Sequence, residues 1–219
     1  MYNQSWLKLV EKHRAIAVIR APQMELGRQM ALAVASGGMH LIEITWNSDK
    51  AAELIANLRS ELPNCTIGTG TILNLEQLKS AIASGTQFVF TPHVDPTLIK
   101  AANDSGVPMV PGALSPTEIV TAWATGASCV KVFPVGAVGG QRYIKSLQGP
   151  LGHIPLIPTG GVTLENAKEF LLAGAIAVGV SGSLFPQKGH TIHSESEQYA
   201  LIAQRAQTLM QNLVNYQTG

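Results

Sequence analysis

Lys131 is the residue whose surroundings in the sequence most favour chemistry. It lies within residues 127–134, an otherwise apolar run with the composition of a short buried β-strand. Burying a lone ammonium group costs several kcal/mol, because the charge loses its hydration. Desolvation lowers the pKa of such an amine, and the neutral amine can attack a carbonyl carbon to form a Schiff base. The position predicts carbonyl chemistry; the alternative is a strand at a sheet edge, where Lys131 would extend its ammonium group into water.

Glu43 is a second charged residue inside an apolar run, Leu41–Thr45. Carboxylates are rarely buried in strands without a partner or a task. One interpretation is a structural ion pair with Lys131. The other is a general acid/base that moves protons during carbinolamine formation and carbon–carbon cleavage. Burial would lower the pKa of Lys131 and a nearby carboxylate would raise it, so the sequence leaves that balance open.

Strand-length apolar runs alternate along the chain with longer amphipathic stretches of helical period. The predicted strands are Ala15–Arg20, His40–Thr45, Cys65–Gly70, Gln87–Thr91, Pro108–Val110, Ser128–Phe133, Ile154–Pro158 and Ile176–Val180. The predicted helices are Trp6–Arg14, Glu25–Ser36, Lys50–Glu61, Leu75–Ser84, Pro96–Ser105, Ser115–Thr125, Leu164–Ala173 and Ser194–Tyr216. Asn74 is expected to cap one helix, and Ser115 and Glu118 to form a capping box on another.

This alternation predicts an α/β fold, a single (β/α)8 TIM barrel formed as one domain by residues 1–219. No dinucleotide-binding glycine fingerprint follows the first strand, which argues against a doubly wound sheet. The helix Trp6–Arg14 is expected to be an extra N-terminal element that closes the bottom of the barrel. A flavodoxin-like sheet is the alternative, because the strand Pro108–Val110 is short.

The composition excludes several function classes. The chain is 46% hydrophobic and 13% charged, with a formal net charge of +1 and no long basic run, so neither nucleic acid nor an anionic membrane is an expected partner. No stretch approaches the about 20 apolar residues of a membrane span, and we expect a cytoplasmic protein. Cys65 and Cys129 are expected to be reduced core residues. No metal site is predicted, since only His190 and His193 have a suggestive spacing, in a polar segment.

In a TIM barrel the active site lies where strands end and the following loops begin. The polar or unusual residues at those positions are Arg20, Glu43, Thr45, Thr71, Pro92, His93, Lys131, Phe133, Thr159, Gly160, Gly161, Ser181, Gly182 and Ser183. If Lys131 points inward, strand alternation points Cys129 and Phe133 inward as well, and Val130 and Val132 toward the helices. The glycine pair precedes a predicted helix whose N-terminus can bind an anion, and loops after the last two strands commonly bind phosphate. Ordinary tight turns are the alternative.

Five motifs occur in register with these strands: Glu43–Thr45, Gly68–Asn74, Thr91-Pro92, Lys131–Pro134 and Pro158–Val162. Together, and in this order over nearly the whole chain, they resemble the 2-keto-3-deoxy-6-phosphogluconate (KDPG) and 4-hydroxy-2-oxoglutarate (KHG) aldolase family. The resemblance implies a class I aldolase, without a metal or other cofactor and typically a homotrimer. It would cleave a keto-deoxy phosphosugar acid or 4-hydroxy-2-oxoglutarate to pyruvate and an aldehyde.

The resemblance also implies roles for individual residues. Lys131 would be the Schiff-base lysine and Glu43 the general acid/base, and Thr71 would help to hold the pyruvate carboxylate. Phe133 and Pro92 would shape the pocket. The phosphate would be bound by Gly160, Gly161 and Ser183. Gly182, between Ser181 and Ser183, belongs to the same predicted phosphate site. The predicted substrate-binding set is completed by Arg20, His93 and Thr159.

The sequence departs from the phosphogluconate branch at Asn47, where that branch has an arginine. Asn47-Ser48 resembles the phosphogalactonate branch, in which an arginine on the first strand serves the substrate, as Arg20 would here. Thr159 resembles the phosphogluconate branch, so the preferred substrate stays open. Two other functions are consistent with the motifs: a phosphate-binding isomerase or synthase with Lys131 as an electrostatic clamp, and a non-catalytic phosphosugar-binding module.

Overall fold

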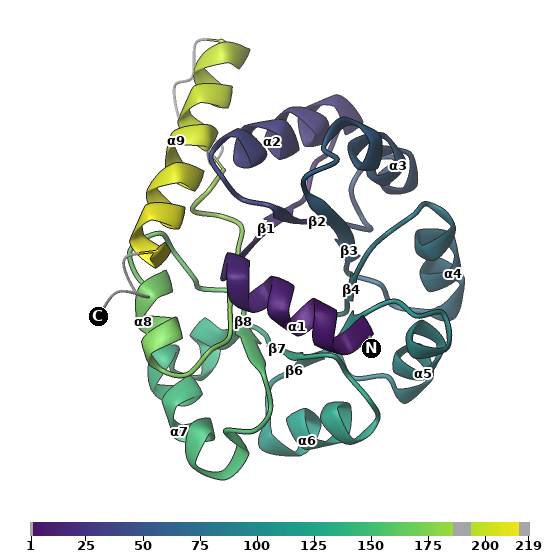
Figure 1. The fold of residues 1–219 in the computed structure, drawn as a ribbon, viewed down its shortest axis with the longest axis vertical. Helices are drawn as coiled ribbons and strands as arrows, with labels where there is room; N and C mark the ends of the chain where they lie inside the picture. Colours follow the sequence, from purple (N-terminus) through teal and green to yellow (C-terminus); the bar gives the residue numbers. More distant parts are fainter. Residues whose placement is uncertain (1, 186–193, 215–219) are drawn as a thin grey trace.

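The computed structural model describes residues 2–185 and 194–214. Strands curl around a common axis, helices α2 to α8 lie outside them, and α1 crosses one end (Figure 1). The strands are β1 (Ala15–Ile19), β2 (Leu41–Thr45), β3 (Thr66–Gly70), β4 (Val89–Phe90), β5 (Met109–Val110), β6 (Gly112–Ala113), β7 (Val130–Val132), β8 (Leu156–Pro158) and β9 (Val178–Val180). Each predicted strand contains one of them, and the predicted fifth strand is extended beyond its end by β6.

The helices are α1 (Tyr2–His13), α2 (Met24–Ser36), α3 (Ala51–Glu61), α4 (Leu75–Ala83), α5 (Pro96–Asp104), α6 (Pro116–Ala124), α7 (Gln141–Leu151), α8 (Ala167–Leu172) and α9 (Glu195–Val214), with a 3₁₀ turn η1 (Val135–Val138). The predicted ranges include no counterpart of α7, because Gly149 and Pro150 have the signature of a loop. The predicted caps are confirmed: Asn74 Oδ1 accepts from Gln77 N, and Ser115 and Glu118 form a capping box.

Two parallel sheets make up the strand layer, which confirms the α/β class. One has the order β5-β4-β3-β2-β1-β9 and the other β6-β7-β8. They meet at two places. Pro111, which has no N–H to donate, separates β5 from β6, while its carbonyl accepts from Lys131 N at 2.9 Å. At the other edge, Thr159 forms a bridge with Gly179 of β9.

Apolar side chains fill two layers, one inside the curled sheets and one between the sheets and the helices. Cys129 lies in the inner layer, whereas Val130 and Val132 lie in the outer one, as strand alternation predicts. Trp6 of α1 is 3% exposed and packs on Phe88, with 4.9 Å between ring centroids. The N-terminal helix therefore closes the end at which the strands begin, as predicted.

The long C-terminal helix α9 packs against α2 and α8, beside the rest of the molecule in Figure 1. It begins and ends within two residues of the predicted range, whose last residue, Tyr216, lies outside the described residues. Within residues 2–185 and 194–214, no helix combines the length and hydropathy needed to cross a bilayer.

Candidate active site

A pocket of about 300 Å³ opens where the strands end. Its wall is formed by Val18, Arg20, Glu43, Thr45, Thr71, Pro92, Lys131, Phe133, Thr159, Gly160 and Ser181. Eight residues to which the sequence gave a role are therefore brought together from six different strands or the loops after them. The sequence assigned no role to Val18, Thr45 or Ser181. Side-chain alternation along β1 and β2 could have identified Val18 and Thr45. Val18 precedes Arg20 by two residues and Thr45 follows Glu43 by two, so each faces the same side as that site residue.

Lys131 lies in β7, the middle strand of its sheet, and its backbone pairs with Gly112 on one side and Ile157 on the other. The residue is 6% exposed. Its Nζ lies 4.7 Å from the Phe133 ring centroid and 5.8 Å from that of Phe90. The interpretation of an edge strand with Lys131 extended into water is therefore wrong. The amine is held among aromatic rings at the pocket wall.

Burial dominates the electrostatics of this amine. Desolvation lowers the pKa of Lys131, the Glu43 carboxylate opposes that change, and the Arg20 charge adds to it. The net direction is downward, which answers the question that the sequence left open. A lower pKa increases the fraction of neutral amine, the form that attacks a carbonyl carbon.

Glu43 is 1% exposed in β2, paired with Val18 of β1 and Gly68 of β3. Desolvation raises the pKa of its carboxyl group, against the pull of Lys131 and Arg20. Its Oε1 is buried and has no hydrogen-bond partner among the described residues. No salt bridge within 4.0 Å joins it to Lys131 in the described part of the chain, although each charge affects the pKa of the other. The arrangement is thus not the structural ion pair considered above.

Two threonines extend the polar surface of the pocket. Thr71 follows β3 with a φ of 62°, a left-handed conformation that strains a β-branched residue. Such strain is concentrated at functional sites, where surrounding contacts hold it. Thr159 is 6% exposed, and its Oγ1, like Glu43 Oε1, is buried without a hydrogen-bond partner among the described residues. A buried oxygen without a partner leaves a hydrogen bond for a bound molecule to supply.

The predicted anion-binding loop differs from expectation. Gly160 lines the pocket, whereas Gly161, Gly182 and Ser183 do not. The helix expected from Leu164 begins only at Ala167 and has six residues, so its N-terminus does not follow the glycine pair. The cause is a turn in which Thr163 N donates to Asn166 Oδ1 at 2.7 Å and Asn166 Nδ2 donates to Gly161 O at 3.0 Å. These side-chain bonds compete with helix formation.

His93 follows β4, where the sequence predicted that it would contact the substrate. His93 does not line the pocket, and the His93 carbonyl accepts a hydrogen bond from Thr91 Oγ1 at 2.7 Å. His190 and His193 lie outside the described residues. Among the described residues, no group of three or more histidine, cysteine, aspartate or glutamate side chains is arranged to hold a metal ion.

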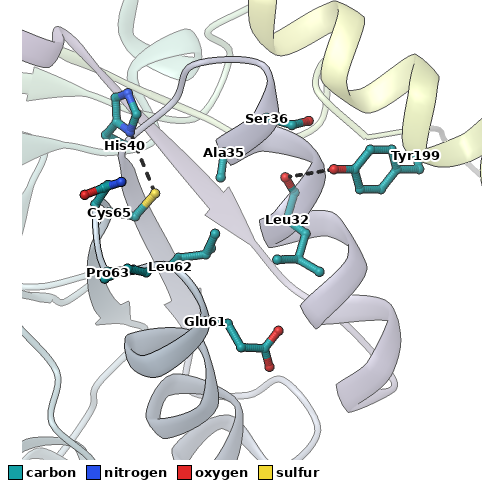
Figure 2. Close-up of a pocket in the computed structure, with 10 residues that line it drawn as sticks. Leu32, Ala35, Ser36, His40, Glu61, Leu62, Pro63, Cys65 and Tyr199 are labelled. Carbon is teal, nitrogen blue, oxygen red and sulfur yellow. Dashed lines mark hydrogen bonds between the residues drawn. The ribbon is translucent and has the colours of Figure 1, made fainter.

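A second hollow, of about 410 Å³, lies at the opposite ends of the strands and is lined by Leu32, Ala35, Ser36, His40, Glu61, Leu62, Pro63, Asn64, Cys65 and Tyr199 (Figure 2). Three of its polar side chains have partners: Cys65 Sγ lies 3.8 Å from His40 Nδ1, Tyr199 Oη donates to Leu32 O, and Glu61 pairs with Arg28 at 2.8 Å. Burial raises the pKa of the Cys65 thiol. This hollow is larger, but it has no buried amine or unpaired carboxyl group.

Comparison with known proteins agrees with the geometry. Residues 7–204 match the family model described as KDPG and KHG aldolase. A 2-dehydro-3-deoxy-phosphogluconate aldolase of Haemophilus influenzae is 35% identical over 184 residues, which cover 83% of this chain and 86% of that protein. Among solved structures, native KDPGal is 29% identical with a TM-score of 0.82, covering 94% of this chain and 96% of the other. A KDPG aldolase of Legionella pneumophila, with pyruvate captured at low pH as a covalent carbinolamine, is 26% identical with a TM-score of 0.83, covering 93% and 97%.

Proposed function

This chain belongs to the KDPG and KHG aldolase family, and we propose that its strand-end pocket performs the class I aldol cleavage of that family with Lys131 as the Schiff-base residue. The enzyme is a carbon–carbon lyase. Its substrates are a 2-keto-3-deoxy-6-phospho sugar acid or 4-hydroxy-2-oxoglutarate, and its products are pyruvate and an aldehyde, glyceraldehyde 3-phosphate or glyoxylate. The observation that carries the proposal is a buried amine sharing one pocket with a buried carboxyl group to which it is not bonded.

The reaction begins when the neutral Lys131 amine adds to the C2 ketone. Glu43 in its protonated form gives a proton to the carbinolamine hydroxyl, which leaves as water. The resulting protonated imine accepts the electron pair of the C3–C4 bond as that bond breaks. Glu43, directly or through water, takes the proton of the C4 hydroxyl, and the aldehyde leaves. Glu43 then returns a proton to C3 of the enamine, and water releases pyruvate and the free amine. A raised carboxyl pKa suits this alternation between acid and base.

The remaining pocket residues bind the substrate in this proposal. Phe133 and Pro92 provide apolar walls beside the amine, and Thr71 holds the pyruvate carboxylate. Thr159 offers an unpaired hydroxyl to the sugar chain. Arg20 lies at the exposed side of the pocket and forms no salt bridge with any described residue, so its charge is available to an anionic substrate group.

The phosphate is proposed to lie against Gly160 and the loop after β9. Gly160 lines the pocket, and the Ser183 hydroxyl is buried without a partner among the described residues. Gly161 and Gly182 would contribute backbone N–H groups from these loops. Because α8 begins only at Ala167, no helix N-terminus directly follows the glycine pair. The two loops and Arg20 would therefore bind the phosphate.

The decisive test is trapping of the imine. The protein is incubated with pyruvate and sodium borohydride, digested, and analysed by peptide mass, which should show a reduced pyruvate adduct on Lys131. A coupled pyruvate-release assay with the phosphogluconate-derived, phosphogalactonate-derived and oxoglutarate-derived substrates then identifies the preferred one. Absence of an adduct on Lys131 would exclude the Schiff-base mechanism and favour the isomerase or synthase alternative.

Fold closure and assembly are further parts of the proposal. A single domain of residues 1–219, closed as a (β/α)8 barrel, is supported by the two junctions between the sheets, at Pro111 and at the Thr159–Gly179 bridge. A homotrimer and a cytoplasmic location rest on the family resemblance and on the balanced charge. Sedimentation of the purified protein tests the trimer.

A further inference from the structure

The Glu43 carboxyl group lies against Gly70 of the neighbouring strand. In the β2–β3 register, Glu43 pairs with Gly68 and Thr45 with Gly70. A Cβ atom built on Gly70 would overlap Oε1 and Cδ of Glu43. Gly70 lies within β3 and has no positive φ, so its backbone would accept alanine. Glycine is therefore required at this position by the space that Glu43 occupies.

The other glycine of β3, Gly68, has a different kind of neighbour. A Cβ on Gly68 would meet the Phe88 ring, which belongs to the apolar interior. Gly68 thus makes room for core packing, and Gly70 makes room for an acid. A similar case occurs at the junction of the two sheets, where a Cβ on Gly179 of β9 would overlap Oγ1 of Thr159. Glu43 Oε1 and Thr159 Oγ1 are both buried and without hydrogen-bond partners among the described residues.

We infer that Gly70 is a positioning residue, whose missing side chain lets the Glu43 carboxyl group lie flat against β3 within reach of the substrate carbon bound to Lys131. The inference rests on the proposed function. With a methyl group on residue 70, the Glu43 carboxyl group must move away from β3. The Glu43 side chain moves because it is flexible, whereas the strand backbone is not. The charged groups that face it are Lys131 of β7 and Arg20 at the end of β1.

The test uses pyruvate and separates the work of the amine from that of the acid. In D2O, Glu43 takes a proton from the C3 methyl group of the pyruvate imine, leaving the enamine, and a deuteron returns to C3. Exchange of the methyl protons, followed by NMR, therefore reports the carboxyl group. Borohydride trapping at equilibrium reports imine on Lys131. Misplacing a catalytic group by about 1 Å can cost about 100-fold in rate.

For Gly70→Ala we expect C3 exchange slowed by about 10- to 100-fold, with the trapped adduct on Lys131 within twofold of wild type. The acid limb of the exchange rate against pH should also move to lower pH, because a carboxyl group displaced from the strand is better hydrated. Normal adduct formation shows that the variant folds. Exchange within twofold of wild type, with an unchanged pH profile, overturns the inference.

A double-mutant cycle distinguishes positioning from a general structural effect. If Gly70 acts through Glu43, adding Gly70→Ala to Glu43→Gln should change the residual exchange by less than twofold. An additional loss as large as that in the wild-type background would show that Gly70 acts elsewhere and would refute the inference. Gly149→Ala is the control, since Gly149 is exposed on α7 and a Cβ there meets nothing within 4 Å. Absence of an adduct on wild-type Lys131 would instead refute the proposed function.

Discussion

The two hollows at opposite ends of the strands each have a buried side chain that is a nucleophile in many enzymes, Lys131 at one end and Cys65 at the other. Burial acts on both in the same way, by disfavouring the charged form. The chemical results are opposite. The neutral amine is the nucleophilic form of lysine, whereas the charged thiolate is the nucleophilic form of cysteine. Burial therefore makes Lys131 more reactive and Cys65 less reactive.

The neighbours of the two groups reinforce this difference. Lys131 shares its pocket with a carboxyl oxygen and a hydroxyl that have no partners among the described residues. At the other hollow, Glu61 is paired with Arg28, and the Cys65 thiol contacts His40. A site that binds and transforms a molecule keeps polar groups unpaired, whereas a surface hollow satisfies them within the protein. Pocket size alone would not have selected the pocket that contains Lys131, since larger hollows lie at the other end of the strands and beside α4 and α5.

The largest expected effect is that of Lys131→Arg. A guanidinium group stays protonated and cannot form an imine, so turnover should fall on the order of 10⁴-fold or more. No borohydride adduct should appear anywhere on the variant, including at Cys65. The pyruvate-release assay and peptide mass measure both outcomes. Substantial residual turnover would mean that Lys131 acts only as a charge.

The second effect is that of Arg20→Met on substrate affinity. Loss of a charge that binds an anionic group should raise KM for the phosphorylated substrate by about 10- to 100-fold, with a smaller change in kcat. Arg142→Met, a change at an exposed residue of α7, is the matched control and should leave KM unaltered. Equal KM values for the two variants would remove Arg20 from the binding site.

The third effect concerns stability, and its sign follows from the raised pKa of Glu43. The unfolded chain loses this proton near pH 4.5, whereas the folded chain holds it to higher pH, so the wild-type protein loses stability as pH rises through the folded pKa. Glutamine does not titrate. The free energy of unfolding of Glu43→Gln, measured in urea, should therefore exceed that of wild type at pH 8, with a smaller difference at pH 5.

The control for this pH dependence is Glu53→Gln. Glu53 is exposed, and its ion pair with Lys50, at 3.7 Å, lies on the surface, where such pairs contribute little to stability. Its difference from wild type should stay within about 0.5 kcal/mol at both pH values. A Glu43→Gln difference that is constant with pH would contradict a raised carboxyl pKa.

The fourth expected effect is small and concerns alkylation of the two cysteines. Iodoacetamide should modify Cys65 slowly near pH 7 and faster above pH 9, because burial raises the thiol pKa. Cys129, whose pKa burial raises to about 12, should react more slowly still. Peptide mass measures the order of reaction, and pyruvate release from the Cys65-modified protein should stay within twofold of the untreated protein. Rapid loss of turnover on Cys65 alkylation would link the two ends of the molecule.

The smallest effect is that of a chelator. In the proposed reaction the protonated imine accepts the electron pair, so the chemistry requires no metal ion. Prolonged treatment with EDTA, followed by the pyruvate-release assay, should leave kcat unchanged. A loss that zinc or magnesium restores would show that the mechanism lacks a component.

The alternation of strands and helices could be predicted because it depends on local periodicity, and the unusual positions of Lys131 and Glu43 could be recognised for the same reason. Caps such as Asn74 and Ser115 depend on adjacent residues, and these predictions are confirmed. The late start of α8 could not be predicted, since a helical pattern from Leu164 competes with side-chain bonds of Asn166 that only the folded loop reveals.

The sequence by itself determined which residues face inward and which strand ends they occupy, because side-chain alternation along a strand is a local property. Only the tertiary structure decided that Lys131 lies in a middle strand among aromatic rings, that no salt bridge joins it to Glu43, and that the Glu43 carboxyl group rests on Gly70. These facts depend on the register between strands that are distant in sequence. Register is set by packing of the whole sheet, and no local pattern contains it.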